Sequence, residues 1–178
     1  MTPTGEFSHK VTIHPWPEGG VTVKLTATAA EREALKARFD LVDLPSLKAS
    51  VGVEKKMMEL VLAGTIEAVV AQSCVVTLKP VTASLEVPIE RYYRRRETHE
   101  KMLAAGETSG IDEDVLDVDV LDGDEIDIGE AVAEEFYLAL EPYPRAADAD
   151  QALEAIKVKT GTEPGDGPAN PFEKLRRH

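Results

Sequence analysis

Apolar and polar positions alternate along much of the first half of the chain, and this pattern predicts β-strands. It is clearest in "VTVKLTA", where Val21, Val23 and Leu25 fall on one face, and "FSHKVTI" is read as the strand before it. The stretches "LKASVGV", "MMELVLAGTIEAVVAQ" and "VVTLKPVTASLEVP" are rich in Val, Ile and Thr, which favour strands. Gly64 is expected to mark a bulge or a sharp bend, and Pro80 a break.

Helices are predicted where apolar residues recur four positions apart and a capping residue precedes the segment. Thr28 and Glu31 form a capping box that opens a helix over residues 29–39. In "DIGEAVAEEFYLALEP", Asp127 is the expected N-cap, and Pro142 prevents the helix from continuing. The stretch "DADQALEAIKVKTG" is a further short helix candidate.

These elements predict an α+β fold built on a mainly antiparallel sheet or partial β-barrel with two or three helices. We expect one domain over residues 6–158 and a flexible C-terminal tail over residues 159–178. After Pro88, "IERYYRRRETHEKMLAAGETSG" is expected to be a long, partly disordered excursion. "DVLDVDVLDGDEIDI" alternates again, which predicts a strand with one solvated face.

The composition of the chain indicates the compartment in which we expect the protein and shows how its charge is distributed. A single cysteine among 178 residues excludes an internal disulfide framework. The sequence shows neither an apolar run long enough to cross a bilayer nor a secretory signal, so we expect a cytoplasmic protein. The net charge of −13 comes from residues 102–144, which hold 14 acidic residues and no Lys or Arg.

Cys74 has three possible roles: a nucleophile, half of a metal site, or a small buried side chain. A catalytic thiolate needs a neighbouring base, and no histidine here belongs to a recognisable catalytic signature. A metal site needs three or four ligands, and there is no second cysteine. We therefore expect burial and no cofactor, with a cysteine-dependent enzyme or a metal-binding module as the alternative.

Two charged stretches are candidate binding surfaces. The acidic stretch, with Asp117, Asp119, Asp122 and Asp124, suits a basic protein partner or is simply the solvated edge of a strand. The second, "RYYRRR", offers candidate RNA contacts at the residues Arg91, Tyr92, Arg94, Arg95 and Arg96. Its alternatives are a solvated strand end, or internal neutralisation of the acidic stretch.

Three motifs, taken in order, resemble the YceD family. "LVLAGTIEAVVAQSCVVTLKPVTASLEVP" is similar to the family's central strand, Cys-x-x-Cys-Leu turn and second strand. "IDIGEAVAEEFYLALEPYPR" and "NPFEKL" resemble its second block and its C-terminal ending. Two departures are that Thr77 occupies the second cysteine position and that Pro142 is displaced after Glu141. A metal or redox role through paired cysteines is therefore not expected here.

The resemblance implies a non-enzymatic accessory factor in accumulation of large-subunit ribosomal RNA. The expected partners are a basic ribosomal protein, a ribosomal RNA precursor, or both, with no membrane and no DNA. The acidic stretch favours the basic protein.

Overall fold

The computed structural model describes residues 6–14, 20–56, 58–105 and 118–160, with side chains up to residue 156. It divides into two compact units. The first comprises residues 1–72 and 82–142, and the second comprises residues 73–81 and 143–178. Asp117 and most of the predicted tail lie outside the described residues.

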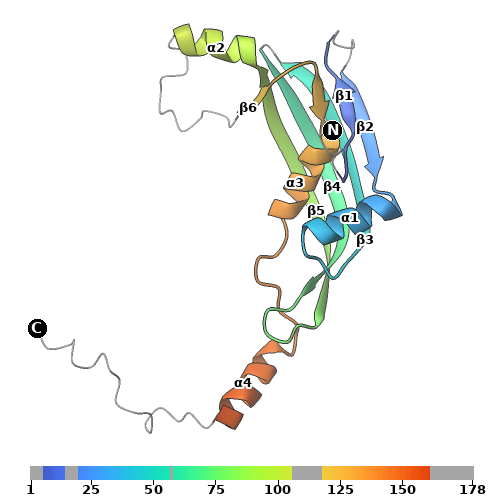
Figure 1. Ribbon diagram of the computed structural model, residues 1–178, viewed down its shortest axis with the longest axis vertical. Helices are drawn as coiled ribbons and strands as arrows, with labels where there is room; N and C mark the ends of the chain where they lie inside the picture. The colour runs from blue at the N-terminus through green and yellow to red at the C-terminus, as the bar shows by residue number, and fades with distance from the viewer. Residues whose placement is uncertain (1–5, 15–19, 57, 106–117, 161–178) are drawn as a thin grey trace, which may run out of the picture. The chain divides into compact units, whose positions relative to one another are not determined.

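The first unit holds a five-stranded sheet in the order β2-β3-β4-β5-β6 and a two-stranded sheet, β1-β7 (Figure 1). Its strands through β4 pair antiparallel with their neighbours, whereas β6 pairs parallel to β5. The sheet is therefore mixed and not a closed barrel. The strands are β1 (Lys10–Thr12), β2 (Val21–Thr26), β3 (Asp43–Lys56), β4 (Glu59–Ser73), β5 (Pro80–Arg95), β6 (Val118–Leu121) and β7 (Glu125–Asp127).

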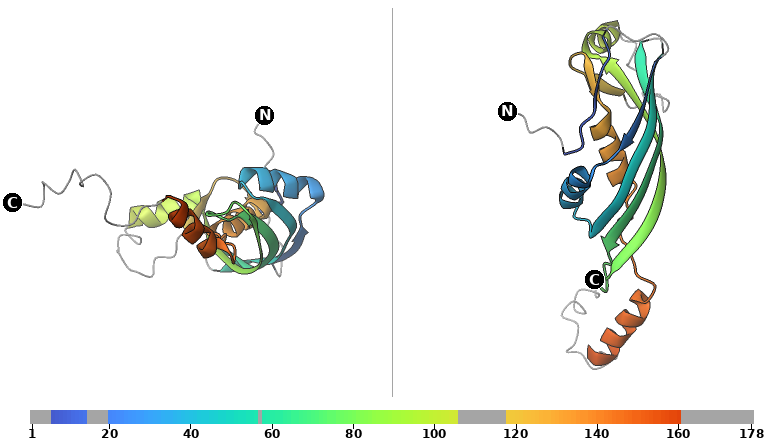
Figure 2. Two further views of the ribbon diagram at one scale, coloured as in Figure 1. Left: turned by 90° about the horizontal axis from the view of Figure 1, so that it is seen from below. Right: turned by 90° about the vertical axis from the view of Figure 1, so that its right-hand side faces the viewer.

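Four helices accompany these strands in the described part of the chain, where two or three were predicted. They are α1 (Ala29–Arg38), α2 (Arg96–Ala105), α3 (Ile128–Leu138) and α4 (Ala149–Thr160). In the first unit, α1 and α3 lie on the same concave face of the curved sheet (Figure 2). None of the helices described is long and apolar enough to span a membrane.

The core of the first unit lies between the concave face of the sheet and these two helices. Alternate residues of β3, such as Val51 and Val53, are buried there with Leu62 and Ile66 of β4. The opposite face carries exposed polar residues, which is the usual arrangement for an antiparallel sheet with one solvated side. Phe136 of α3 is also fully buried in this core.

Several predicted elements are confirmed. The Thr28 hydroxyl accepts a bond from the Glu31 N–H, and the Glu31 carboxylate accepts one from the Thr28 N–H, so the capping box opens α1. Asp127 caps α3 and accepts from the Glu130 N–H. On β6, Val118 and Val120 are half-buried while Asp119 is exposed, as the alternation predicted.

Two sequence predictions are wrong. The β3–β4 register is continuous at Gly64, so β4 has no bulge at this residue. Pro80 does mark a boundary, because β4 ends at Ser73 and β5 begins at Pro80, but β5 then continues through Pro88 to Arg95. The segment expected to be an excursion then forms α2 directly after β5, at least up to Ala105.

Candidate functional site

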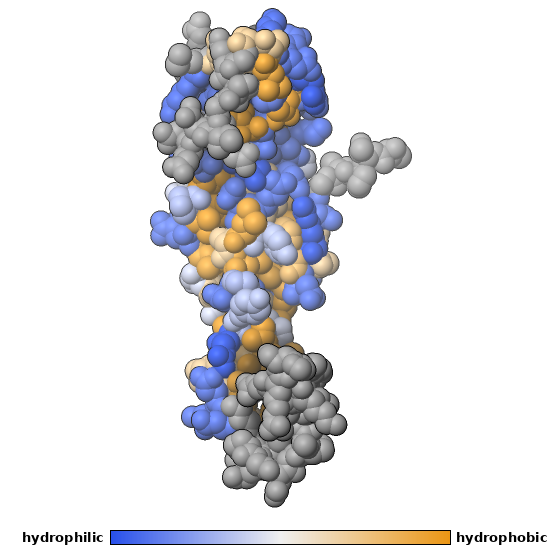
Figure 3. Space-filling model, turned by 90° about the vertical axis from the view of Figure 1, so that its left-hand side faces the viewer, coloured by the Kyte–Doolittle hydropathy of each residue, from blue (hydrophilic) through white to orange (hydrophobic). Residues whose placement is uncertain are grey.

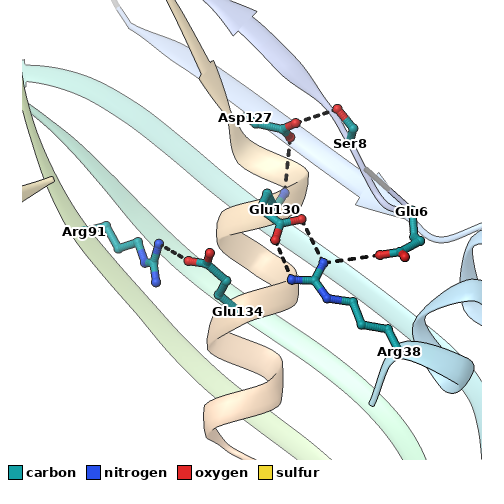
Figure 4. Close-up of polar contacts among 7 residues, drawn as sticks. All are labelled: Glu6, Ser8, Arg38, Arg91, Asp127, Glu130 and Glu134. Carbon is teal, nitrogen blue, oxygen red and sulfur yellow. Dashed lines mark hydrogen bonds and ion pairs between the residues drawn. The ribbon is translucent and has the colours of Figure 1, made fainter. Parts of the chain in front are cut away.

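The predicted RNA-contacting arginines lie at the end of β5 and, for Arg96, at the start of α2, and each has a carboxylate partner. The Arg91 guanidinium points toward α3 (Figure 4), where Nη1 donates to Glu134 at 2.6 Å and Nε to Glu135 at 3.0 Å. Its Nη1 also lies 3.7 Å from Asp119 of β6. These carboxylates hold the pKa of Arg91 above its ordinary value even though partial burial opposes them.

The following arginines are paired in the same way. Arg94, on the other face of β5, bonds Glu59 of β4. Arg95 bonds Asp124, and Arg96 bonds Asp122, with 2.7 Å between its Nη2 and the carboxylate. The Tyr92 hydroxyl donates to Glu90 at 2.5 Å.

The two predicted surfaces are therefore one ion-pair cluster. Asp119 of β6, which pairs parallel with β5, faces Arg91, and Asp122 and Asp124, in the segment between β6 and β7, face Arg96 and Arg95 respectively. Internal neutralisation, one of the alternatives left open by the sequence, is what the structure shows here. These three aspartates are at least half exposed, and such pairs are worth little in water.

The neutralisation is incomplete. Around these arginines the structure also places two glutamates of α3, which sequence reasoning did not single out. The carboxylates of Asp119, Asp122, Asp124, Glu134 and Glu135 surround the guanidinium groups of Arg91, Arg95 and Arg96. The cluster keeps a net negative charge. The alternating spacing of the aspartates was the sequence signal for their part of the cluster. The contribution of α3 depends on tertiary packing, which the sequence does not show.

A second group of polar contacts fixes the start of α3 (Figure 4). The Asp127 carboxylate accepts bonds from the Ser8 hydroxyl at 2.5 Å and from the His9 N–H at 2.8 Å, in addition to capping α3. One turn later, Glu130 accepts two bonds from Arg38 of α1, at 2.6 and 3.0 Å. These contacts tie α3 to the N-terminal segment and to α1.

Removing the charge at Asp127 should lower stability in a pH-dependent way. Partial burial alone would raise the pKa of Asp127, but the bonds from Ser8, His9 and Glu130 outweigh it and lower the pKa. The carboxylate therefore stabilises the fold fully above the ordinary aspartate pKa of about 3.9, and this contribution is lost as the pH falls through the lower folded pKa. We expect Asp127→Ala to cost about 1–2 kcal/mol at neutral pH.

Urea unfolding of the wild type and of Asp127→Asn, from neutral pH down to about pH 3, checks this expectation. The stability difference between them should narrow toward acid. Glu54→Gln, at an exposed carboxylate of β3, is the control and should show no such narrowing. A constant difference between wild type and Asp127→Asn would contradict the assigned role.

A hollow of about 640 Å³ lies near the cluster in the first unit. Lys55 and Lys101 line it and have no ion pair among the described residues, whereas Arg95 is paired with Asp124. The remaining lining residues are Ile13, His14, Met58, Glu59, Leu60, Tyr93 and Thr98. Two lysines without an ion pair in the described part of the chain, in the lining of one hollow with a tyrosine, suit a phosphate-bearing ligand.

Cys74 belongs to the second unit and is fully buried, as predicted. Its sulfur accepts bonds from the N–H groups of Ala146 at 3.2 Å and of Val76 and Thr77 at 3.4 Å. The Ala146 N–H is the main reason that the Cys74 pKa falls to about 6, and Thr77 and Val76 add to it, outweighing desolvation. The sulfur thus anchors a turn instead of packing in the main core.

The groups described around the Cys74 sulfur are mainly backbone N–H donors, and Lys79 lies close enough to interact with it electrostatically. The hydrogen bonds to its sulfur come from Val76, Thr77 and Ala146, and these residues have no side chain that could act as a base. Within the described parts of the chain, no three or more His, Cys, Asp or Glu side chains are grouped so as to hold a metal.

A protein-family model matches the greater part of this chain. The model described as "Large ribosomal RNA subunit accumulation protein YceD" matches residues 62–177, which is more than half of the chain. Comparisons with curated proteins and with solved structures gave no significant match.

Proposed function

Because this chain belongs to the YceD family, we propose that it is a non-enzymatic accessory factor in large-subunit ribosomal RNA accumulation that acts by binding a basic ribosomal protein. The family description supports the process. The binding mode is inferred from the surface at the β5–β6 end of the sheet.

The observation that carries the proposal is the negative surplus around the arginines of β5. Asp122 is 69% exposed although it is paired, so a lysine or arginine of a partner reaches it without desolvating a buried charge. A phosphate backbone would instead be repelled by the surplus carboxylates. The acidic surface (Asp119, Asp122 and Asp124) therefore fits a basic protein better than RNA.

Direct contact with ribosomal RNA is the second candidate, and a separate observation favours it. Lys55 and Lys101 line the hollow without ion pairs in the described part of the chain, close to Tyr93 and Arg95. An unpaired nucleotide would place its phosphate against these lysines and its base against the apolar wall.

Charge-neutralising variants separate the two candidates, because the aspartates and arginines are partners. In Asp119→Asn/Asp122→Asn/Asp124→Asn, binding to a purified basic large-subunit protein should weaken about tenfold, mainly through the association rate, and the loss should shrink at high salt. The same variant frees Arg95 and Arg96, so RNA binding through these arginines should become stronger.

Arg94→Gln/Arg95→Gln/Arg96→Gln is the reciprocal variant: it frees Asp124 and Asp122 from their partners, so protein binding should be retained or become stronger. Lys55→Gln/Lys101→Gln tests the hollow, and Lys24→Gln/Lys48→Gln, at positions of β2 and β3 that do not line it, is the matched control. The measurements are biolayer interferometry with individual large-subunit proteins and filter binding with large-subunit RNA. Protein binding is the wrong mode if RNA binding is lost in the arginine variant or in the hollow variant while the aspartate variant keeps its binding to the protein.

A further inference from the structure

Strand β5 has one edge that is open over most of its length. It runs for 16 residues from Pro80 to Arg95, and β4 lies along one side of it. On the other side, β6 pairs only with Tyr92 to Arg95. Among the strands that the structure describes, no other lies beside the earlier part of β5. An open edge of this kind presents backbone N–H and C=O groups that can pair with another strand.

The sequence of β5 shows which groups face this open edge. Pro88 has no N–H, and a proline is tolerated within a sheet where its nitrogen faces an unpaired edge. Since β4 occupies one side, the Pro88 nitrogen faces the open side. Backbone groups alternate between the two sides of a strand, so the N–H and C=O groups of Thr82, Ser84 and Glu86 face it as well.

Side chains along the same stretch have two distinct faces. Ala83, Leu85 and Val87 are half-buried on the concave face and pack against the core, while Thr82, Ser84 and Glu86 are exposed on the other face. Hydrophobic side chains gather on the side of the first unit where β5 and α3 lie (Figure 3). Leu138 of α3 is 72% exposed.

We propose that β5 of one copy pairs antiparallel with β5 of a second copy about a two-fold axis at Ser84. In this register Thr82 lies opposite Glu86 of the second copy, and Ala83 opposite its Leu85. The prolines at positions 80 and 88 lie opposite each other and end the ladder on both sides. The result is an isologous dimer with one continuous sheet.

Other registers of the same two strands are worse. An axis at Glu86 places two glutamates directly opposite each other, which is destabilising. An axis at Leu85 places Pro88 opposite Thr82, so a missing donor interrupts the ladder. A shift by one residue turns the concave face of one copy outward and exposes its apolar side chains. Of these registers, only the one centred on Ser84 places polar opposite polar and apolar opposite apolar side chains, keeps the glutamates apart and leaves no donor missing within the ladder. This self-complementarity favours a second copy over an unrelated strand.

Light scattering during gel filtration tests the dimer with the full chain. The wild type should elute as a dimer at micromolar concentration, and Ser84→Lys, which brings two ammonium groups together at the axis, should shift it to the monomer. Ser50→Lys introduces the same charge on the same solvated face but on the interior strand β3, and should stay dimeric. A monomeric wild type, or a Ser84→Lys variant that stays dimeric, overturns the proposal.

Cysteine cross-linking tests the register independently of any loss of folding. Ser84→Cys should form a disulfide-linked dimer under mild oxidation, because the two positions meet at the axis. Thr82→Cys alone should not, but it should cross-link when mixed with Glu86→Cys chains. The native Cys74 is fully buried and should not compete. Cross-linking of Thr82→Cys alone, or failure of Ser84→Cys, contradicts this register.

Discussion

Gly64→Ala should lower the free energy of unfolding by about 4 kcal/mol, which is a large part of the stability of a typical domain. A Cβ at this position would lie 2.2 Å from the Ser50 carbonyl oxygen and 2.7 Å from the Val51 Cα of the neighbouring strand β3. Both atoms are backbone atoms in the middle of the sheet, so they cannot move aside without breaking the β3–β4 pairing.

Gly52→Ala is the matched control, because Gly52 lies on the adjoining strand almost opposite Gly64. The nearest atoms to a Cβ there are 3.9 Å away, which is ordinary contact distance. Glycine weakens a strand interior, so this change should be neutral or slightly stabilising. Chemical denaturation followed by circular dichroism measures both variants. Equal stability for the two would show that the close approach at Gly64 does not constrain the sheet.

Phe136→Ala should cost about 3–5 kcal/mol, the second largest effect we expect. Phe136 has no exposed surface and lies in the core between α3 and the sheet, with its ring centroid 6.0 Å from that of Phe39. Truncation leaves a cavity that the curved sheet cannot close. Because α3 also supplies Glu134 and Glu135 to the ion-pair cluster, loosening it should weaken partner binding as well.

The neighbouring residue on the same helix provides the control. Tyr137 is 52% exposed and stacks on Phe39 with ring centroids 4.8 Å apart. Tyr137→Ala should therefore cost about 1 kcal/mol, in the range of a single aromatic pair. Thermal unfolding of the two variants measures the contrast. A larger loss for Tyr137→Ala than for Phe136→Ala would mean that α3 is held mainly by its exposed side.

Elements governed by short-range signals could be predicted from the sequence. The Thr28–Glu31 capping box and the Asp127 cap involve atoms three residues apart, so the sequence alone places the starts of α1 and α3. The alternation in β2 and β6 likewise predicts which side chains face the core. These signals hold because local geometry and tertiary packing agree.

Elements that depend on distant partners could not be predicted. Helix α2 follows β5 in a charged stretch without a strong apolar stripe, so its sequence was indistinguishable from a solvated loop. The stretch after Pro88 was expected to leave the sheet because its composition becomes charged and then small and polar. In the structure, β5 continues because one of its edges is open at that point.

The candidate site shows the same division. The acidic and basic stretches were both recognised, and their mutual neutralisation was one of the alternatives considered. The parallel β5–β6 pairing, for example Tyr92 beside Val118, brings the two stretches together, and this pairing has no local signature. The participation of Glu134 and Glu135 depends on where α3 packs.

The pairing of β1 with β7 also bears on how the chain acquires its structure during synthesis. Lys10 lies opposite Asp127, so the ends of this small sheet are separated by more than a hundred residues. Strands β2, β3 and β4 can pair with their sequence neighbours as they leave the ribosome, whereas β1 must wait until β7 has emerged. Until then β1 lacks the strand it pairs with, so the synthesis of β7 determines when β1 can enter its sheet.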